Sequence, residues 1–213
     1  MKKMFLVTLM LFATAVLIPS CVASEGSESQ RTSPKSADEL AIGADAPKFS
    51  LVNTADGKTY SFTPGDGKPA VVVFTCNHCP YSKAFENRIV ELGREYGKKG
   101  IAFYAVNPND DVAYPSESAD KMKDRATTKN YPFPYLKDGD SEVARAYGAR
   151  VTPHVFLVDA RGKVAYRGYV DDSAKSDERE HEGLSEAMDA LLAEKEIQKA
   201  STKAFGCTIK WKS

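Results

Sequence analysis

Cys76 and Cys79 are the residues whose type and spacing most directly allow chemistry. They bracket Asn77 and His78, and Pro80 follows the second cysteine. Two cysteines at this spacing can exchange electrons with other thiols, contribute to a metal site, or form an inert structural disulfide. A disulfide that closes so short a loop removes little entropy from the unfolded chain, so a purely structural role is the less favoured of the three.

A metal site built on the same pair would need more ligands than the neighbourhood offers. A structural zinc site usually has four, and the sequence contains no second closely spaced pair of cysteines. The remaining candidate ligands are His154, His181 and Cys207. We therefore expect no metal, and we keep a copper- or zinc-binding module that uses Cys76, Cys79 and a histidine as the third interpretation.

The elements around the pair would place it at the start of a helix. Residues 70–74, AVVVF, form a continuous apolar run that is typical of a strand buried on both faces. After the cysteines, apolar residues recur at helical spacing, namely Phe85, Ile89, Leu92 and Tyr96. We expect Cys76 at the helix N-terminus, where unpaired N–H groups and the helix dipole stabilise a thiolate. A protonated His78 would support the same charge.

The rest of the chain alternates between strand and helix patterns. The predicted elements are a hairpin over 46–62, a strand over 101–106, helices over 118–129 and 141–148, a short strand at 133–136, a second hairpin over 154–170 and a closing helix that contains Leu184, Met188 and Leu191. This order predicts an α/β fold in which a central mixed β-sheet is flanked by helices as an α/β/α sandwich.

The strand–Cys-x-x-Cys–helix order and the segment VTPHVFLVDARGKVAYRG resemble the thioredoxin-like superfamily over about residues 42–192. Four further segments, FTCNHCPYSKAFENRIVEL, YAVNPND, YPFPYLKD and GCTIKW, resemble a bacterial subgroup of exported redoxins of the AhpC/TSA, or peroxiredoxin-like, type. The resemblance implies that Pro153 follows a cis peptide bond and packs beside the two sulfurs. It also implies that Thr152 presents its backbone N–H and C=O groups to an extended substrate segment.

The resemblance leaves two activities open, and the residues favour dithiol–disulfide exchange without any cofactor beyond the dithiol itself. In that reaction the Cys76 thiolate attacks a substrate disulfide and Cys79 resolves the mixed disulfide. Peroxide reduction by Cys76, an antioxidant activity, is the alternative. Peroxiredoxins carry a Ser or Thr three residues before the attacking cysteine, whereas this sequence has Val73 there, and Arg150 is the nearest candidate to bind peroxide.

Two further roles stay open at this point. The apolar strand before the cysteines carries no acid to accept a proton, and Glu86 is at best a weak substitute that we expect at the surface. Cys207 could resolve either cysteine, pair with another chain or pack beside Trp211 as a small apolar residue. The direction of electron flow is also open.

The N-terminal residues predict export. Residues 1–23 combine two lysines, a short apolar run and small residues, as a signal peptide does. Cleavage after Ala23 would release a soluble protein, whereas LIPSC resembles a lipoprotein signal in which Cys21 is lipidated. Residues 24–41 are predicted to be a flexible linker, 42–195 the thioredoxin-like domain and 196–213 a C-terminal tail.

These features together predict location and partners. We expect a periplasmic protein, or a membrane-anchored lipoprotein that faces the periplasm or exterior. Its partners would be protein disulfides or thiols, with a membrane or periplasmic electron donor or acceptor. The 29 basic and 29 acidic residues cancel to a formal net charge of zero, which argues against nucleic acid as a partner.

Overall fold

The computed structural model describes residues 38–212 of the 213-residue chain. The predicted signal peptide, Cys21 and all but the last few residues of the predicted linker lie outside the described residues. None of the helices in residues 38–212 is both long enough and apolar enough to span a bilayer.

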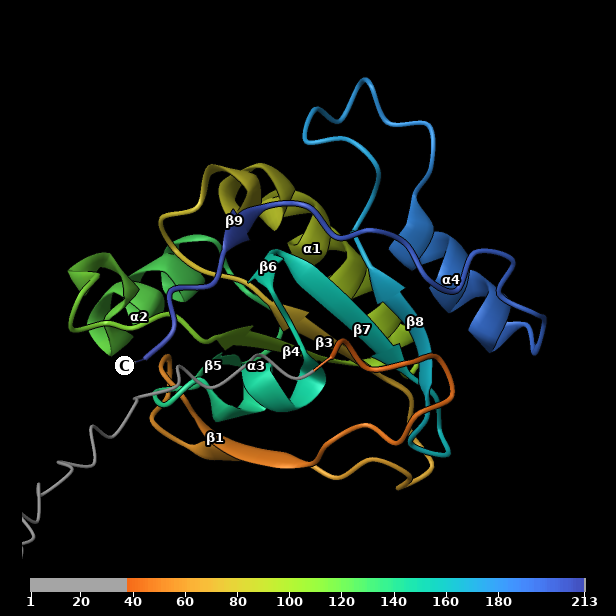
Figure 1. Ribbon diagram of the computed structural model, residues 1–213, viewed down its shortest axis with the longest axis horizontal. Coiled ribbons are helices and arrows are strands. Elements are labelled where there is room, and N and C mark those ends of the chain that lie inside the picture. Colours follow the sequence, from red (N-terminus) through yellow and green to blue (C-terminus); the bar gives the residue numbers. More distant parts are fainter. Residues whose placement is uncertain (1–37, 213) are drawn as a thin grey trace, which may run out of the picture. The chain divides into compact units, whose positions relative to one another are not determined.

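A seven-stranded mixed sheet forms the centre of the fold, in the order β2-β1-β5-β4-β3-β7-β8 (Figure 1). Its strands are β1 (Phe49–Asn53), β2 (Thr59–Phe62), β3 (Ala70–Phe74), β4 (Ala102–Asn107), β5 (Tyr135–Lys137), β7 (His154–Val158) and β8 (Val164–Gly168). The three central strands β5, β4 and β3 run parallel, whereas β1–β2 and β7–β8 are antiparallel hairpins at the two edges. The predicted mixed sheet is confirmed.

Helices cover both faces of this sheet. They are α1 (Pro80–Lys98), α2 (Ala119–Thr128), α3 (Glu142–Tyr147) and α4 (Gly183–Leu192), and a 3-10 turn spans Pro115–Glu117. α1, α2 and α4 pack on one face, and α3 packs on the other (Figure 1). The predicted helical pattern after the cysteines is confirmed, since Phe85, Ile89 and Tyr96 are buried along α1.

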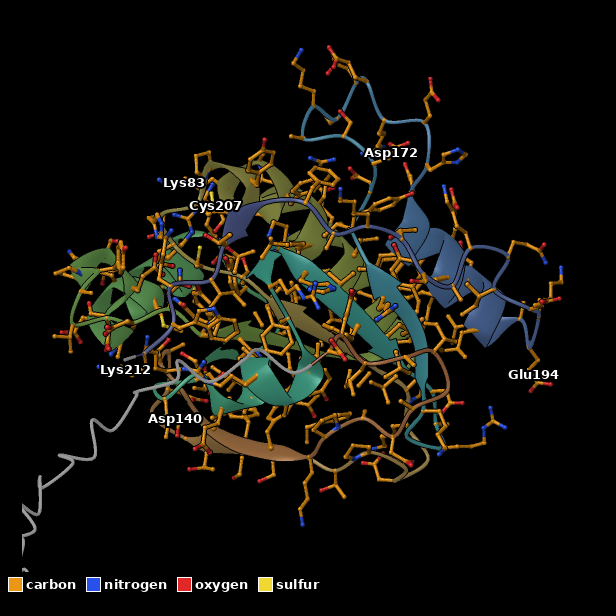
Figure 2. The ribbon with its side chains drawn as sticks, in the orientation of Figure 1. Lys83, Asp140, Asp172, Glu194, Cys207 and Lys212 are labelled. Carbon is orange, nitrogen blue, oxygen red and sulfur yellow. The ribbon has the colours of Figure 1, made fainter. Side chains whose placement is uncertain are left out.

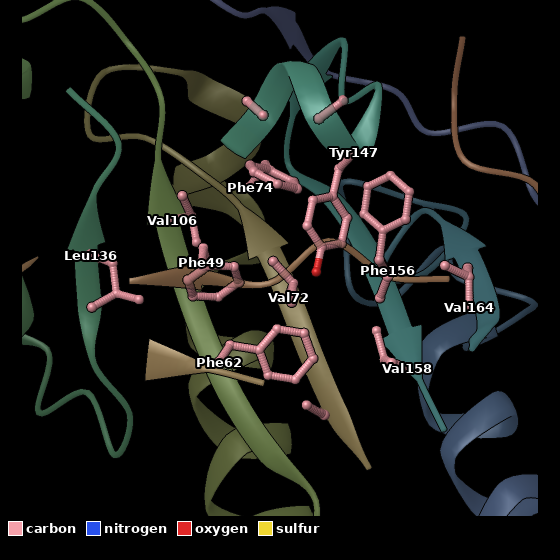
Figure 3. Close-up of a cluster of buried hydrophobic side chains, with 14 of the residues drawn as sticks. Phe49, Phe62, Val72, Phe74, Val106, Leu136, Tyr147, Phe156, Val158 and Val164 are labelled. Carbon is pink, nitrogen blue, oxygen red and sulfur yellow. The ribbon is translucent and has the colours of Figure 1, made fainter. Parts of the chain in front are cut away.

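The core lies on both sides of β3, because successive side chains of a strand point to opposite faces. Val72 and Phe74 join the cluster that α3 covers, where Phe74, Tyr147 and Phe156 meet with ring centroids 5.2–5.9 Å apart (Figure 3). Val71 and Val73 pack against α1 and α4 on the other face. Each such buried side chain contributes about 1.5–3 kcal/mol, so the end of β3 is held firmly.

Two short strands lie outside the main sheet and were not predicted. β6 (Val151–Thr152) pairs antiparallel with β9 (Cys207–Thr208), so the C-terminal residues return to the segment before Pro153 (Figure 1). Part of the predicted tail therefore packs on the domain, and Ile209 is buried in its core. Strands of two residues carry too little pattern to be recognised in a sequence.

Candidate active site

The two cysteines lie in the connection between β3 and α1, at the carboxyl ends of the parallel strands where α/β folds commonly bind ligands. α1 begins at Pro80, and its N-cap residue is Cys79 with an extended backbone, φ −60° and ψ 125°. The expectation that Cys76 occupies the helix N-terminus is therefore wrong. A proline disfavours helical geometry in the residue before it, so the helix cannot begin earlier than Pro80.

Thr152 joins both sulfurs to the segment before Pro153. The Cys76 Sγ lies 3.1 Å from the Thr152 Oγ1, and the Cys79 Sγ lies 3.2 Å from the Thr152 carbonyl oxygen. The peptide bond between Thr152 and Pro153 is cis. The structure therefore brings together four of the predicted site residues, and both cysteines are buried, with 2% of Cys76 and 0% of Cys79 exposed.

The backbone of Thr152 is not open to a substrate strand as the resemblance implied. Thr152 pairs with Cys207 of β9, and its carbonyl oxygen lies 3.2 Å from the Cys79 Sγ. The chain's own C-terminal segment thus occupies the strand edge beside the cis peptide bond. An incoming segment could pair there only after β9 has moved.

Glu117 is a site residue that the sequence reasoning missed. It lies in the 3-10 turn that follows β4, and its side chain is fully buried. One carboxylate oxygen accepts the backbone N–H of Asn77 at 2.9 Å and the side-chain amide of Asn107 at 2.7 Å. The other accepts the backbone N–H of His78 at 3.0 Å. This carboxylate therefore fixes the loop between the two cysteines.

The charge of Glu117 persists despite its burial. Burial by itself raises the pKa of a carboxyl group, but the N–H donors of Asn77, His78 and Asn107 outweigh it and hold the pKa of Glu117 below its ordinary value. A negative charge therefore lies beside Cys76. No sequence pattern points to Glu117, because the polar loop around it resembles an ordinary solvated turn.

The His78 side chain contacts the same carboxylate. Its Nδ1 lies 2.5 Å from a Glu117 oxygen, and its ring stacks on Tyr114 with centroids 5.6 Å apart. A proton on His78 would thus be paired with Glu117 as well as lie near Cys76. Glu117 would therefore neutralise part of the positive charge that we predicted His78 to contribute to a thiolate on Cys76.

The Cys76 and Cys79 side chains share one hydrogen bond, and it shifts the pKa values of the two thiols in opposite directions. The hydrogen bond from Cys76 lowers the pKa of Cys79 to about 4, although burial opposes it, and donors from Cys207 and Ser82 act in the same direction. The same shared hydrogen bond raises the pKa of Cys76, as do burial and the charge of Glu117. In the reduced form the negative charge therefore sits on Cys79 at the start of α1, and not on Cys76 as we expected.

Glu86 and Arg150 have structural roles of their own. Only 4% of the Glu86 side chain is exposed, so the expectation of a surface residue is wrong, and its carboxylate accepts from Arg125 and Tyr131. Arg150 pairs with Asp38 at 3.9 Å. Within residues 38–212, the two sulfurs hydrogen-bond to each other, to Thr152, Ser82 and Cys207, and to no arginine.

A metal would have to compete with existing hydrogen bonds. Among the described residues, Cys76, His78 and Glu117 each offer one ligand atom within 4.8 Å of the others. Both oxygens of Glu117 already accept N–H donors from the loop, as described above. Glu117 therefore anchors the loop between the two cysteines through hydrogen bonds that do not require an ion.

Comparison with known proteins gives the family context of this site. The model of the AhpC/TSA family matches residues 42–167. The thiol-disulfide oxidoreductase ResA of Geobacillus thermodenitrificans is 29% identical over 59% of this chain and 67% of its own length. The thiol:disulfide interchange protein DsbE of Vibrio cholerae is 26% identical over 76% of this chain and 81% of its own.

Solved structures agree in fold. An uncharacterised conserved protein from Geobacillus kaustophilus is 38% identical, with a TM-score of 0.76 over 81% of this chain and 93% of the other. A hypothetical protein from Sinorhizobium meliloti is 30% identical, with a TM-score of 0.77 over 83% and 97% of the two chains. The peroxidoxin BcpB of Mycobacterium tuberculosis is 16% identical with a TM-score of 0.57, a likeness of fold alone.

Proposed function

The chain belongs to the AhpC/TSA family of thioredoxin-like proteins and is a thiol–disulfide oxidoreductase, and we propose that Cys76 and Cys79 carry the exchange. The observation that carries this proposal is the contact of both sulfurs with Thr152, directly before the cis bond to Pro153. The dithiol is the only redox group that the reaction requires, so no further cofactor is proposed.

In the proposed reaction, Cys76 attacks and Cys79 resolves. Both sulfurs are buried, but Cys79 is also in contact with Cys207, so Cys76 is the sulfur that we expect a substrate to reach first. As Cys76 attacks, the proton of the shared hydrogen bond moves to Cys79, and a mixed disulfide forms with release of one substrate thiolate. Cys79 then loses that proton and attacks Cys76, which leaves a Cys76–Cys79 disulfide and a substrate dithiol.

Glu117 and His78 act in this proposal as positioning residues. Glu117 accepts the two backbone N–H groups of Asn77 and His78, and its charge keeps the resting thiolate on Cys79. His78 lies close enough to Cys76 to offset part of that charge when it is protonated. Thr152 supports both sulfurs and, once β9 has moved, offers its backbone to an extended substrate.

The proposed location is outside the cytoplasm, either periplasmic or as a lipoprotein facing that side. The signal-like pattern of residues 1–23 supports export, and disulfide exchange suits an oxidising compartment. Proposed partners are protein disulfides or thiols and a membrane or periplasmic electron donor or acceptor. The mass of the mature N-terminus would distinguish a lipidated Cys21 from cleavage after Ala23.

A trapping experiment tests the proposed order of attack. In a Cys79→Ser variant, a protein disulfide substrate should remain attached to Cys76, because the resolving sulfur is missing. Proteolysis and mass spectrometry without reductant would identify the linked peptides, with Cys76→Ser as the matched control. Attachment through Cys207 in place of Cys76, or none in Cys79→Ser while the wild type reduces the substrate, would contradict the proposal.

A further inference from the structure

The C-terminal segment lies directly on the redox pair. β9 pairs with β6 in a register that sets Cys207 opposite Thr152, and the backbone N–H of Ile209 donates to the Arg150 carbonyl at 3.1 Å. Figure 2 shows Cys207 beside the first turn of α1, which begins directly after Cys79. A third cysteine is thus fixed beside the other two by main-chain pairing.

Gly206 allows this close approach. A Cβ atom at this position would lie 2.2 Å from the Thr152 carbonyl oxygen and 2.7 Å from its carbonyl carbon. Real side chains do not tolerate such distances, so only glycine lets the segment lie flat on the peptide bond before Pro153. The tail is therefore built to rest on the redox site.

Contacts on both sides of Cys207 hold this position. On one side Phe205 packs edge-on against Phe85 of α1, with ring centroids 5.6 Å apart. On the other, Ile209 is buried in the core. The carbonyl oxygen of Thr152, which pairs with Cys207, lies 3.2 Å from the Cys79 Sγ, and the Cys207 side chain hydrogen-bonds to that of Cys79.

We propose that Cys207 is a third redox-active cysteine, which exchanges with Cys79 and turns the Cys76–Cys79 disulfide into a Cys79–Cys207 disulfide. The Cys207 thiolate attacks the Cys79 sulfur, the Cys79–Cys207 bond forms and the Cys76–Cys79 bond breaks. Cys76 leaves as a thiolate and takes up a proton from solvent, which replaces the one that Cys207 lost. The step moves the disulfide within the chain without net oxidation, and it rests on the proposed function.

The charges around Cys207 favour this exchange only in the oxidised protein. In the dithiol form, burial and the neighbouring Cys79 thiolate raise the pKa of Cys207 to about 11. Once Cys79 is part of a disulfide its charge is gone, so that contribution disappears, while the nearby Lys210 still favours the Cys207 thiolate. Cys207 is thus protonated and unreactive when Cys76 and Cys79 are reduced, and it is a better nucleophile when they form a disulfide.

A Cys79–Cys207 disulfide would also affect the edge of β6 at Thr152, where a substrate strand would pair. A Cys79–Cys207 bond would fix β9 on Thr152 and leave Cys76 as a free thiol. The oxidised protein would then hold its disulfide under a closed strand edge. Reduction of that bond would be needed before β9 could move and a substrate strand could pair with β6.

The test uses the full-length chain with single cysteine changes. A Cys76→Ser variant, oxidised with diamide and then alkylated, should form a Cys79–Cys207 disulfide within one chain, detected by peptide mapping that keeps Cys21 separate. The matched Cys79→Ser variant should give at least tenfold less Cys76–Cys207 disulfide, because Cys207 lies beside Cys79. Free Cys79 and Cys207 in folded Cys76→Ser, or only cross-links between chains, would overturn the inference.

A second variant tests the role of the segment without touching a cysteine. In a Cys76→Ser background, Gly206→Ala should slow formation of the Cys79–Cys207 disulfide at least tenfold, because the added methyl group displaces β9. Gly97→Ala is the matched control, since a Cβ there meets nothing within 4 Å. An unchanged rate in Gly206→Ala, with circular dichroism confirming that both variants fold, would also overturn the inference.

The two proposals fail in different ways. If wild-type protein exchanges with protein disulfides but no Cys79–Cys207 bond forms, only the third-cysteine inference is wrong. If wild-type protein does not exchange at all, the proposed function is wrong, whatever disulfide Cys207 makes.

Discussion

At the residue scale, the site depends on where one negative charge rests. The hydrogen bond between the two sulfurs, the helix that begins after Cys79 and the carboxylate of Glu117 all place it on Cys79. The sequence indicated the two cysteines and their place between a strand and a helix, but not which sulfur carries the negative charge. It depends on Pro80 fixing the start of the helix and on a carboxylate that is 38 positions after Cys79 in the chain.

The lowered pKa of Cys79 predicts an acid-resistant thiolate. Because the pKa is about 4, the reduced protein should keep its thiolate absorbance at 240 nm from pH 8 down to about pH 5 and lose it around pH 4. An unperturbed thiol would instead lose it around pH 8.5. The matched control is Cys79→Ser, in which this acid-resistant absorbance should be absent. A wild-type midpoint above pH 7 would contradict the described charge distribution.

The same shift predicts how the reduced protein responds to acid. A group whose pKa is lower in the folded state stabilises the fold above its unfolded pKa, and this contribution is lost as the pH falls through the folded value. The Cys79 contribution should therefore be complete above about pH 9 and decline from there towards pH 4. Urea unfolding of the reduced wild type and Cys79→Ser across this range would measure the difference between them.

Replacement of Glu117 should loosen the loop between the cysteines. In Glu117→Gln one acceptor oxygen becomes an amide group, so buried N–H donors of the loop lose a partner, at a cost of about 1–3 kcal/mol in the free energy of unfolding. Loss of the negative charge should also lower the pKa of Cys76. The exposed Glu91 provides the control Glu91→Gln, which should change neither property. Equal stability of the two variants would show that Glu117 does not anchor the loop.

At the element scale, the elements of the main sheet and the four helices were predictable, including the short β5 and α3, whereas the segments that pair outside the sheet were not. The all-apolar run of β3 and the apolar stripe of α1 matched their predicted positions. β6, β9 and the turn around Glu117 were missed, because two or three residues held by distant partners carry no periodicity. Local pattern therefore predicts the position of Cys76 and Cys79, whereas Glu117 and Cys207 reach the site only because the fold brings distant segments together.

Glu86 joins two of these elements. Its buried carboxylate on α1 accepts two N–H donors from Arg125 of α2 and the hydroxyl of Tyr131. Because removal of one partner leaves a buried charge unpaired, Glu86→Gln should lower the free energy of unfolding by about 3 kcal/mol. Urea denaturation would measure this, and Glu91→Gln on the same helix is again the control. A loss below about 0.5 kcal/mol would show that the pair contributes no more than a surface one.

At the scale of the whole molecule, the fold collects its redox groups at one edge of the sheet. β3 leads to Cys76, β4 leads to the turn with Glu117, and the cis bond at Pro153 precedes β7. The C-terminal segment closes over this edge through β9. The residue pattern predicted the first of these contributions and the family resemblance implied the third, whereas the closing segment comes from pairing across more than fifty residues.

The choice between disulfide exchange and peroxide reduction tests the central claim most directly. Reduced wild-type protein would be mixed in parallel with a protein disulfide and with hydrogen peroxide, and the loss of thiols at Cys76 and Cys79 followed over time by alkylation and mass spectrometry. We predict that the protein disulfide oxidises both cysteines together and at least tenfold faster than an equal concentration of peroxide. Rapid oxidation of Cys76 by peroxide, with little reaction with the protein disulfide, would contradict the account.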